Sequence, residues 1–178
     1  MIVHGATGCG KTHLAQVWAQ MSGARIADGA AIAGNLETLL QCSDLIVDGL
    51  DVVAGDAALE QALFHLCNHI QQTGHMLLTA AVPPPQLAIR LPDLRSRLCS
   101  YPEAALLPPD DALLAALLIK QFNDRQLRVG QDLIDFLLPR IERSAAAAAR
   151  IVAALDAAAL ERKARVTVSL ARDILNKN

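Results

Sequence analysis

The chain has 178 residues, which is long enough for one domain, or for one domain with a small second unit, to bury an apolar core. Its net charge of -2 provides no basic field to attract nucleic-acid phosphates, so we expect no sequence-specific DNA binding. No apolar run reaches the roughly 20 residues of a membrane helix, no secretory leader is apparent and the four cysteines form no CxxC pair, which favours a cytoplasmic protein without membrane contact or disulfides.

The N-terminal half alternates short apolar runs with segments of helix length. Strands are predicted at residues 1–5, 24–28, 44–48 and 75–81, and helices at residues 11–21, 36–41, 58–72 and 84–90. A further apolar run at residues 98–104 is a candidate fifth strand. Because strands that alternate with helices pair in parallel and are covered on both faces, this half predicts a three-layer α/β/α domain with a parallel sheet.

From Pro108 onward the pattern changes to helices alone. They are predicted at residues 110–122, 131–140, 144–162 and 169–175. Pro108 and Pro109 mark the boundary, because two prolines cannot continue a strand ladder and commonly precede a helix. We therefore predict an α/β domain at residues 1–106 and a small all-helical domain at residues 107–178.

The stretch GATGCGKT, which begins at Gly5, lies between the first predicted strand and the first predicted helix. It matches G-x-x-x-x-G-K-[ST] in full, in the strand-to-helix context that this phosphate-binding motif requires. Gly5, Gly8 and Gly10 let backbone N–H groups turn towards an anion at a helix N-terminus. Lys11 adds a cation for the outer phosphates, and Thr12 adds a hydroxyl for Mg²⁺. The motif predicts binding of ADP or ATP with Mg²⁺.

Two further residues of this region, Cys9 and His13, are expected to line the nucleotide site. Cys9 is interpreted as a small filler within the loop, because the loop offers no neighbouring base that would make the thiol a nucleophile. His13 is interpreted as a packing residue at the margin of the pocket.

A second motif lies at the end of the strand predicted at residues 44–48. In P-loop ATPases this strand ends in an aspartate that holds Mg²⁺, and an acid beside it often positions the attacking water. Asp48 supplies the first role, but Gly49 stands where the acid is expected. Since loss of a positioned base costs a factor of about 10² to 10⁴ in rate, we expect nucleotide binding with weak hydrolysis. The alternative is that Asp51 has taken over the role of the acid.

Several stretches resemble the AAA+ module of the DnaA replication-initiator family: LFHLCNHIQQTG, LLTAAVPPPQL, LPDLRSRL and RIERSAAAAARIVAALD. Together they are similar to the short branch of that family called Hda, in its alphaproteobacterial form, which has no DNA-binding domain. The similarity extends over nearly the whole chain. It implies a P-loop AAA+ fold, in which the all-helical domain is the lid.

The resemblance implies roles for two arginines. Arg97 in LRSRL matches the arginine finger that reaches into a neighbouring subunit's nucleotide, and Arg143 in IERS matches the sensor arginine that the lid presents to bound phosphates. A guanidinium suits both roles because its planar fork stays charged and pairs with phosphate oxygens. The alternative is that both are solvated surface residues. Ala81 stands where the family carries a polar sensor, with only Thr79 nearby, which implies weakened phosphate sensing.

The resemblance also implies partners. Proteins of this branch act on DnaA and dock on the sliding clamp through an N-terminal peptide, which this chain does not contain, and the segment that helps to hold the adenine is likewise outside it. Either the reading frame starts late, or this is a reduced relative. The oligomeric state stays open, with a homo-oligomer as one option.

We therefore predict a nucleotide-binding regulator of replication initiation that offers Arg97 to the ATP bound by DnaA. Two alternatives remain. One is a self-sufficient ATPase, such as a helicase-loader-like motor that uses Asp51 or water alone. The other is a degenerate, nucleotide-free interaction module built on the same fold.

Overall fold

The computed structural model describes residues 1–176 and divides into two compact units. The first unit runs from Met1 to Leu107 and contains a sheet with its helices, and the second begins at Pro108 and is helical. Each unit has its own buried apolar core. We describe each unit by itself.

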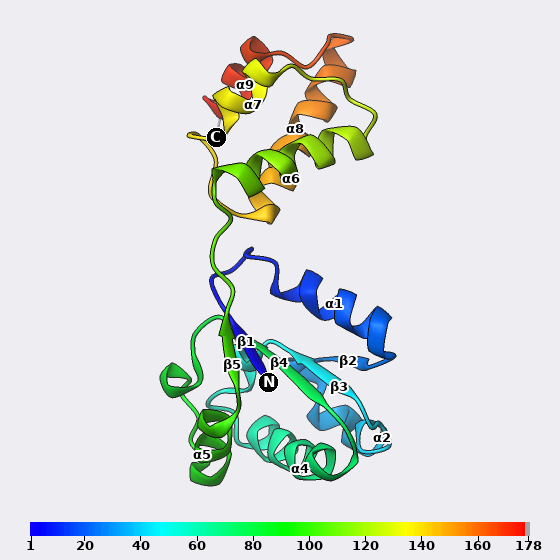
Figure 1. Cartoon of the computed structure of the whole chain (residues 1–178), viewed down its shortest axis with the longest axis vertical. Coiled ribbons are helices and arrows are strands. Elements are labelled where there is room, and N and C mark those ends of the chain that lie inside the picture. Colours follow the sequence, from blue (N-terminus) through cyan, green and yellow to red (C-terminus); the bar gives the residue numbers. More distant parts are fainter. Residues whose placement is uncertain (177–178) are drawn as a thin grey trace. The chain divides into compact units, whose positions relative to one another are not determined.

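The first unit is built on a five-stranded parallel sheet (Figure 1). Its strands are β1 (Ile2–His4), β2 (Arg25–Asp28), β3 (Leu45–Asp48), β4 (Met76–Ala80) and β5 (Glu103–Ala105), in the spatial order β2-β3-β4-β1-β5. In the register, Asp28 lies beside Asp48 and His4 lies beside Ala80. The carboxyl ends of these strands therefore meet along one edge of the sheet.

Helices cover both faces of the sheet, as the alternation of strands and helices predicted. On one face, Val3, Ile46 and Leu77 pack with Ala15 of α1 (Lys11–Ser22). The neighbouring strand residues point to the other face, because side chains alternate along a strand. There they pack with α2 (Leu36–Leu39), α3 (Leu50–Val53), α4 (Ala57–Thr73) and α5 (Pro92–Ser100). The predicted three-layer α/β/α fold is thus confirmed.

One predicted element was wrong and one was misplaced. The helix predicted at residues 84–90 is only a short 3-10 turn, Pro84–Gln86, after which the chain forms no helix until Pro92. The candidate fifth strand at residues 98–104 is present as β5, but it is shorter and begins only at Glu103, because the first part of that run belongs to the end of α5. Leu94 and Leu98 are buried while Ser96 between them is exposed, which indicates a helix, because residues two apart on a strand share a face.

The segment that replaces the predicted helix is held by a buried carboxylate. Glu60 of α4 is 1% exposed, and its oxygens accept hydrogen bonds from the backbone N–H groups of Gly55, Arg90 and Leu91 at 2.8–3.1 Å. The N–H groups of residues 90 and 91 therefore donate to a side chain in place of a helix carbonyl. Desolvation raises the pKa of Glu60, but these three donors and the Arg90 charge outweigh it and leave the pKa below its ordinary value.

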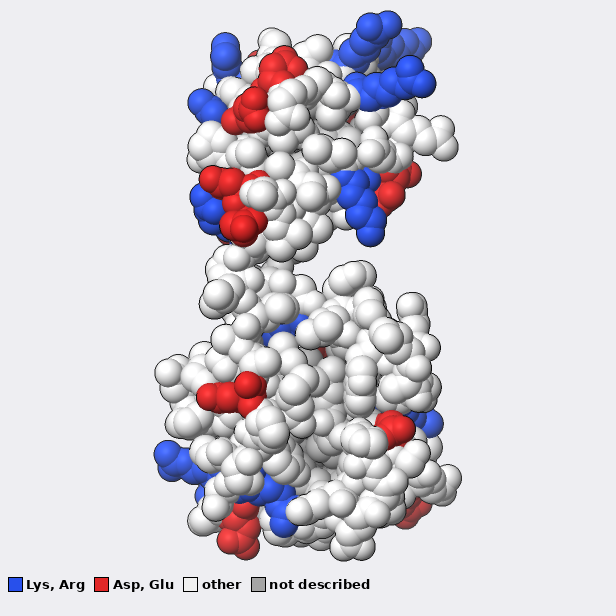
Figure 2. Space-filling view, viewed as in Figure 1, with Lys and Arg blue, Asp and Glu red and all other residues white. Residues whose placement is uncertain are grey.

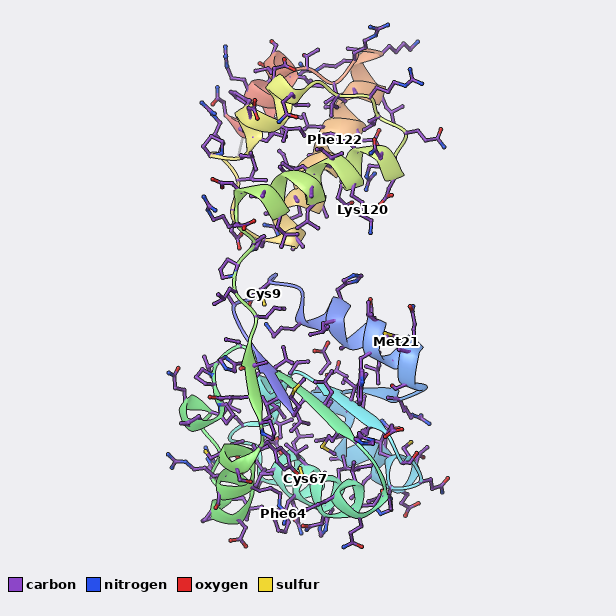
Figure 3. The ribbon with its side chains drawn as sticks, in the orientation of Figure 1. Cys9, Met21, Phe64, Cys67, Lys120 and Phe122 are labelled. Atoms are coloured by element: carbon purple, nitrogen blue, oxygen red, sulfur yellow. The ribbon has the colours of Figure 1, made fainter. Side chains whose placement is uncertain are left out.

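Up to residue 176, the second unit is a bundle of four helices: α6 (Asp111–Asp124), α7 (Gln131–Leu137), α8 (Ala145–Arg162) and α9 (Val168–Leu175). Their core contains fully buried side chains such as Leu155 and Phe122, of which Phe122 is labelled in Figure 3. Asp110, Ser144 and Thr167 cap three of the helices, each accepting a backbone N–H bond with its side chain. Within residues 1–176, every helix is too short or too polar to span a lipid bilayer.

Charged groups of both signs are spread over the two units. Figure 2 shows uncharged atoms over most of the visible face of the first unit, with single acidic and basic side chains between them. The second unit carries more charge on the face shown, again of both signs. This distribution is consistent with the net charge of -2.

We expect Glu60→Gln to lower the free energy of unfolding of the first unit by about 2–4 kcal/mol, because an amide leaves buried N–H groups without an anionic acceptor. Urea unfolding followed by the fluorescence of Trp18, the chain's single tryptophan, measures this. The exposed Glu37→Gln is the matched control and should stay within about 0.5 kcal/mol of the wild type.

The effect should depend on pH with a defined sign. Because the pKa of Glu60 is lower in the folded chain than its ordinary value of 4.5, its stabilising contribution is complete above that value and is lost as the pH falls through the folded-state pKa. The difference between wild type and Glu60→Gln should therefore shrink below about pH 4.5. A difference that grows on acidification would contradict this assignment.

Candidate nucleotide-binding site

The loop between β1 and α1 has the geometry of an anion cradle. Gly10 caps the N-terminus of α1 with φ 107°, in the left-handed region that side-chain-bearing residues rarely adopt. At Gly5 the loop passes close to the chain that leaves β5, since an added Cβ would lie 2.3 Å from the carbonyl oxygen of Leu106. Both positions therefore require glycine. Without side chains there, backbone N–H groups of the loop and of the N-terminus of α1 are accessible to an anion.

The Lys11 ammonium lies within this loop. Its Nζ donates hydrogen bonds to the carbonyl oxygens of Gly5 at 2.6 Å and Ala6 at 3.0 Å. Cys9 lies in the same loop with its Sγ 4.0 Å from the Nζ (Figure 3), and His13 is exposed on the first turn of α1. The loop thus carries a positive charge where the motif predicts the outer phosphates.

Oxygen ligands for a divalent cation meet beside the loop. The Thr12 hydroxyl donates to Asp48 Oδ2 at 2.9 Å, and the hydroxyl of Thr79, on β4, donates to Asp48 Oδ1. The Thr79 oxygen in turn accepts the backbone N–H of Gly49 at 2.9 Å. Hydroxyl and carboxylate oxygens are ligands that Mg²⁺ prefers, so Thr12 and Asp48 fit the ion that the motif predicts.

A hollow of about 340 Å³ opens in front of these groups, lined by Lys11, Thr12, Ile26, Asp28, Asp48, Gly49 and Thr79. It lies at the carboxyl ends of β2, β3 and β4, where open α/β sheets bind their ligands. A larger apolar hollow of about 450 Å³ lies at the opposite ends of the strands, next to Met1 and Met76. We assign the nucleotide to the smaller hollow because it contains the ammonium, hydroxyl and carboxylate groups.

The structure gives a reason for the missing acid at position 49. Gly49 has φ 91° and precedes α3, so a side chain there would strain the backbone. Both oxygens of Asp51 accept the backbone N–H of Ala81, at 3.0 and 2.8 Å. Asp51 is absent from the residues that line the hollow, and its carboxylate instead holds the end of β4.

Sequence reasoning missed one carboxylate of the hollow, Asp28. It belongs to no motif, and only the register of β2 against β3 brings it beside Asp48. A usable signal was the position of Asp28 at the end of a predicted strand, since carboxyl ends of neighbouring parallel strands meet at one edge.

Arg97 lies on α5, away from the residues that line the hollow. Its guanidinium donates to Gln71 Oε1 at 2.8 Å and lies 5.4 Å from the centroid of the Phe64 ring, both on α4. Burial raises the pKa of the neighbouring Tyr101 to about 12, helped by Cys67 and opposed by Arg97. Arg97 is thus held on the surface of α4 and does not line the chain's own phosphate hollow.

Arg143 belongs to the second unit, between α7 and α8. Its Nη2 lies 2.7 Å from Asp111 Oδ1, and both side chains are more than half exposed. An exposed ion pair of this kind contributes about 0–1 kcal/mol. Arg143 can therefore exchange Asp111 for another anion at little cost.

Comparisons with known proteins give one family match, to the second unit, and structural matches that cover both units. Residues 110–175 match the family model described as Hda, lid domain. Domain III of the Thermotoga maritima replication initiation protein DnaA superimposes with a TM-score of 0.84 at 18% identity, over 99% of this chain and 82% of that chain.

Two longer proteins match as well. A replication initiator DnaA bound to AMPPCP and single-stranded DNA gives a TM-score of 0.75 at 18% identity, over 92% of this chain. The Thermotoga maritima RuvB Holliday junction branch migration motor gives 0.77 at 18% identity, over 98% of this chain. The chain spans 57% of that DnaA chain and 60% of the RuvB chain. At this identity, the likeness concerns the fold alone.

We expect Thr79→Val, which keeps the shape of the side chain but removes its hydroxyl, to destabilise the first unit by about 1–3 kcal/mol, because the part-buried N–H of Gly49 and the Asp48 carboxylate each lose a partner. Urea unfolding followed by Trp18 fluorescence measures the loss. Thr79→Ser retains the hydroxyl and serves as the control. Equal stability of the two variants would show that these hydrogen bonds contribute nothing.

Proposed function

We propose that the chain is a DnaA/Hda-like AAA+ protein that binds ADP or ATP with Mg²⁺ and regulates the initiation of chromosome replication by acting on DnaA. The observation that carries this proposal is the combination of a complete phosphate cradle with no acid after Asp48. Such a site suits a protein that holds a nucleotide more than one that turns it over rapidly.

Nucleotide binding is supported by the chemistry of the hollow. Backbone N–H groups at the N-terminus of α1 and the Lys11 ammonium would receive the phosphates, whose oxygens replace the carbonyl oxygens of Gly5 and Ala6 as acceptors of the ammonium. Thr12 and Asp48 would hold Mg²⁺. When bound, the ion would supply positive charge that stabilises the phosphate oxygens.

The action on DnaA is assigned to Arg97. Its position on α5, outside the chain's own hollow, suits a guanidinium that reaches the nucleotide of another subunit. Gln71 and Phe64 would hold it extended from α4 until a phosphate takes over as its partner. In P-loop NTPases a finger of this kind is worth about 10³ to 10⁵ in rate.

Arg143 is assigned to the bound phosphates of the chain's own nucleotide. The weak, exposed pair with Asp111 leaves its guanidinium charged and ready to change partner. The match of residues 110–175 to the Hda lid supports this role, because the segment that carries Arg143 lies within the matched range.

A second candidate, a self-sufficient ATPase, is favoured by one observation: the hollow contains a second carboxylate, Asp28, beside Asp48. The two candidates differ in the expected rate of ATP hydrolysis by the chain alone. Turnover of roughly 1 s⁻¹ or faster by the purified chain alone, the lower end of ordinary enzyme rates, would favour the motor over the regulator.

Lys11→Ala should weaken ADP binding by roughly 10- to 100-fold, because the hydrogen bonds of the ammonium to the phosphates are charge-assisted. Isothermal titration calorimetry in the presence of Mg²⁺ measures the affinity. Lys120→Ala, which removes an exposed lysine of α6 (Figure 3), is the matched control and should bind ADP like the wild type. Unchanged binding by Lys11→Ala would mean that the cradle does not hold the nucleotide.

For Arg97→Ala we expect ADP binding within about threefold of the wild type but stimulation of ATP hydrolysis by purified DnaA reduced at least about tenfold, since the finger acts on the transition state of the partner. Phosphate release from ATP-loaded DnaA measures the stimulation. Arg95→Ala, on the exposed side of the same helix, is the matched control. Full stimulation by Arg97→Ala would refute the finger assignment.

A further inference from the structure

The hollow is lined by a carboxylate, Asp28, from β2, a strand that contributes no residue to the phosphate motif or to the Asp48 motif. Asp28 is the last residue of β2, and it lies in register with Asp48, the last residue of β3. Both residues line the same hollow with Lys11 and Thr12. The acid that is missing after Asp48 on β3 thus has a counterpart on the neighbouring strand.

Gly29 and Gly49 allow the end of β2 to lie close to position 49, where the acid is missing. Gly29, which follows Asp28, is buried, and an added Cβ would lie 2.3 Å from the carbonyl oxygen of Gly49. The backbone at Gly49 and the backbone that leaves Asp28 are therefore in close contact. A bulky residue at position 29 would separate them, so the sequence of this turn keeps Asp28 beside Gly49.

The Asp28 side chain is oriented but still accessible. Its Oδ1 accepts the backbone N–H of Ala30 at 2.9 Å, which fixes the carboxylate at the start of the following turn. The residue is exposed, so its second oxygen can accept a hydrogen bond from water in the hollow. The competing acid, Asp51, has both oxygens on the N–H of Ala81 and does not line the hollow.

The geometry points to Asp28 as the catalytic carboxylate for a slow intrinsic hydrolysis of bound ATP, an inference that rests on the proposed nucleotide binding. The oxygen of a water molecule forms a bond to the γ-phosphorus, and the bond from that phosphorus to the β–γ bridging oxygen breaks, so that ADP leaves with the electron pair. Asp28 accepts a proton from the attacking water and passes it to the released phosphate or to solvent.

The test compares full-length wild type with Asp28→Asn, whose amide oxygen can still accept the N–H of Ala30. We expect single-turnover hydrolysis of Mg²⁺–ATP to fall by about 10²-fold or more, while the affinity for ATP stays within about threefold of the wild type. Asp28→Glu should recover part of the rate. Asp51→Asn, measured in parallel, should retain the wild-type rate.

A binding measurement separates catalysis from structure. ADP with fluoroaluminate mimics the transferring phosphoryl group together with the attacking water, so Asp28→Asn should lose at least about tenfold in affinity for this complex, whereas its affinity for ADP alone stays unchanged. Trp18 fluorescence and thermal unfolding report whether the variant folds like the wild type.

Other results would overturn either the role of Asp28 or the proposed function, and the measurements distinguish the two. Normal hydrolysis by Asp28→Asn, or no hydrolysis by wild-type protein that binds Mg²⁺–ATP, would overturn the role of Asp28 and leave nucleotide binding standing. A rate that high Mg²⁺ restores fully would make Asp28 a metal ligand and also overturn it. If the wild type binds neither ADP nor ATP, the proposed function itself fails.

Discussion

The carboxylate of Asp48 is the junction on which the nucleotide site depends. It accepts hydrogen bonds from Thr12, on the helix that follows the phosphate loop, and from Thr79, on the neighbouring strand. One side chain therefore ties α1, β3 and β4 together at the carboxyl edge of the sheet. Thr79 extends the junction to the backbone of Gly49, so the loop, the cation ligands and the turn after β3 are fixed relative to one another.

The same junction constrains what can follow it. The backbone of Gly49 is in the left-handed region, at φ 91°, so an acid at that position would be strained whatever space surrounds it. The carboxylates of the region are instead distributed over neighbouring elements, with Asp28 at the hollow and Asp51 on the backbone of Ala81. In the function that we propose, the chain holds its nucleotide at this edge and acts on its partner through Arg97, on a different surface of the same unit.

The parts of the fold that were predicted correctly have strong local signals. The first four apolar runs form β1 to β4. The phosphate motif lies between β1 and α1, as predicted from its glycines and lysine, each of which the motif specifies by position. The segment between β4 and β5 was predicted wrongly. Its N–H groups are satisfied by Glu60, which lies 30 residues away in the sequence, and no local pattern records such a partner.

The sequence by itself determined the fold class, the order of the first four strands, the phosphate cradle and the absence of an acid at position 49, since each follows from residue type and spacing along the chain. Only the tertiary structure decided which carboxylates face the hollow. Asp51 is near Asp48 in sequence but is bound to β4, whereas Asp28 is distant in sequence and lies beside Asp48. The reason is that strand pairing, and not sequence distance, decides which side chains meet at the edge of a parallel sheet.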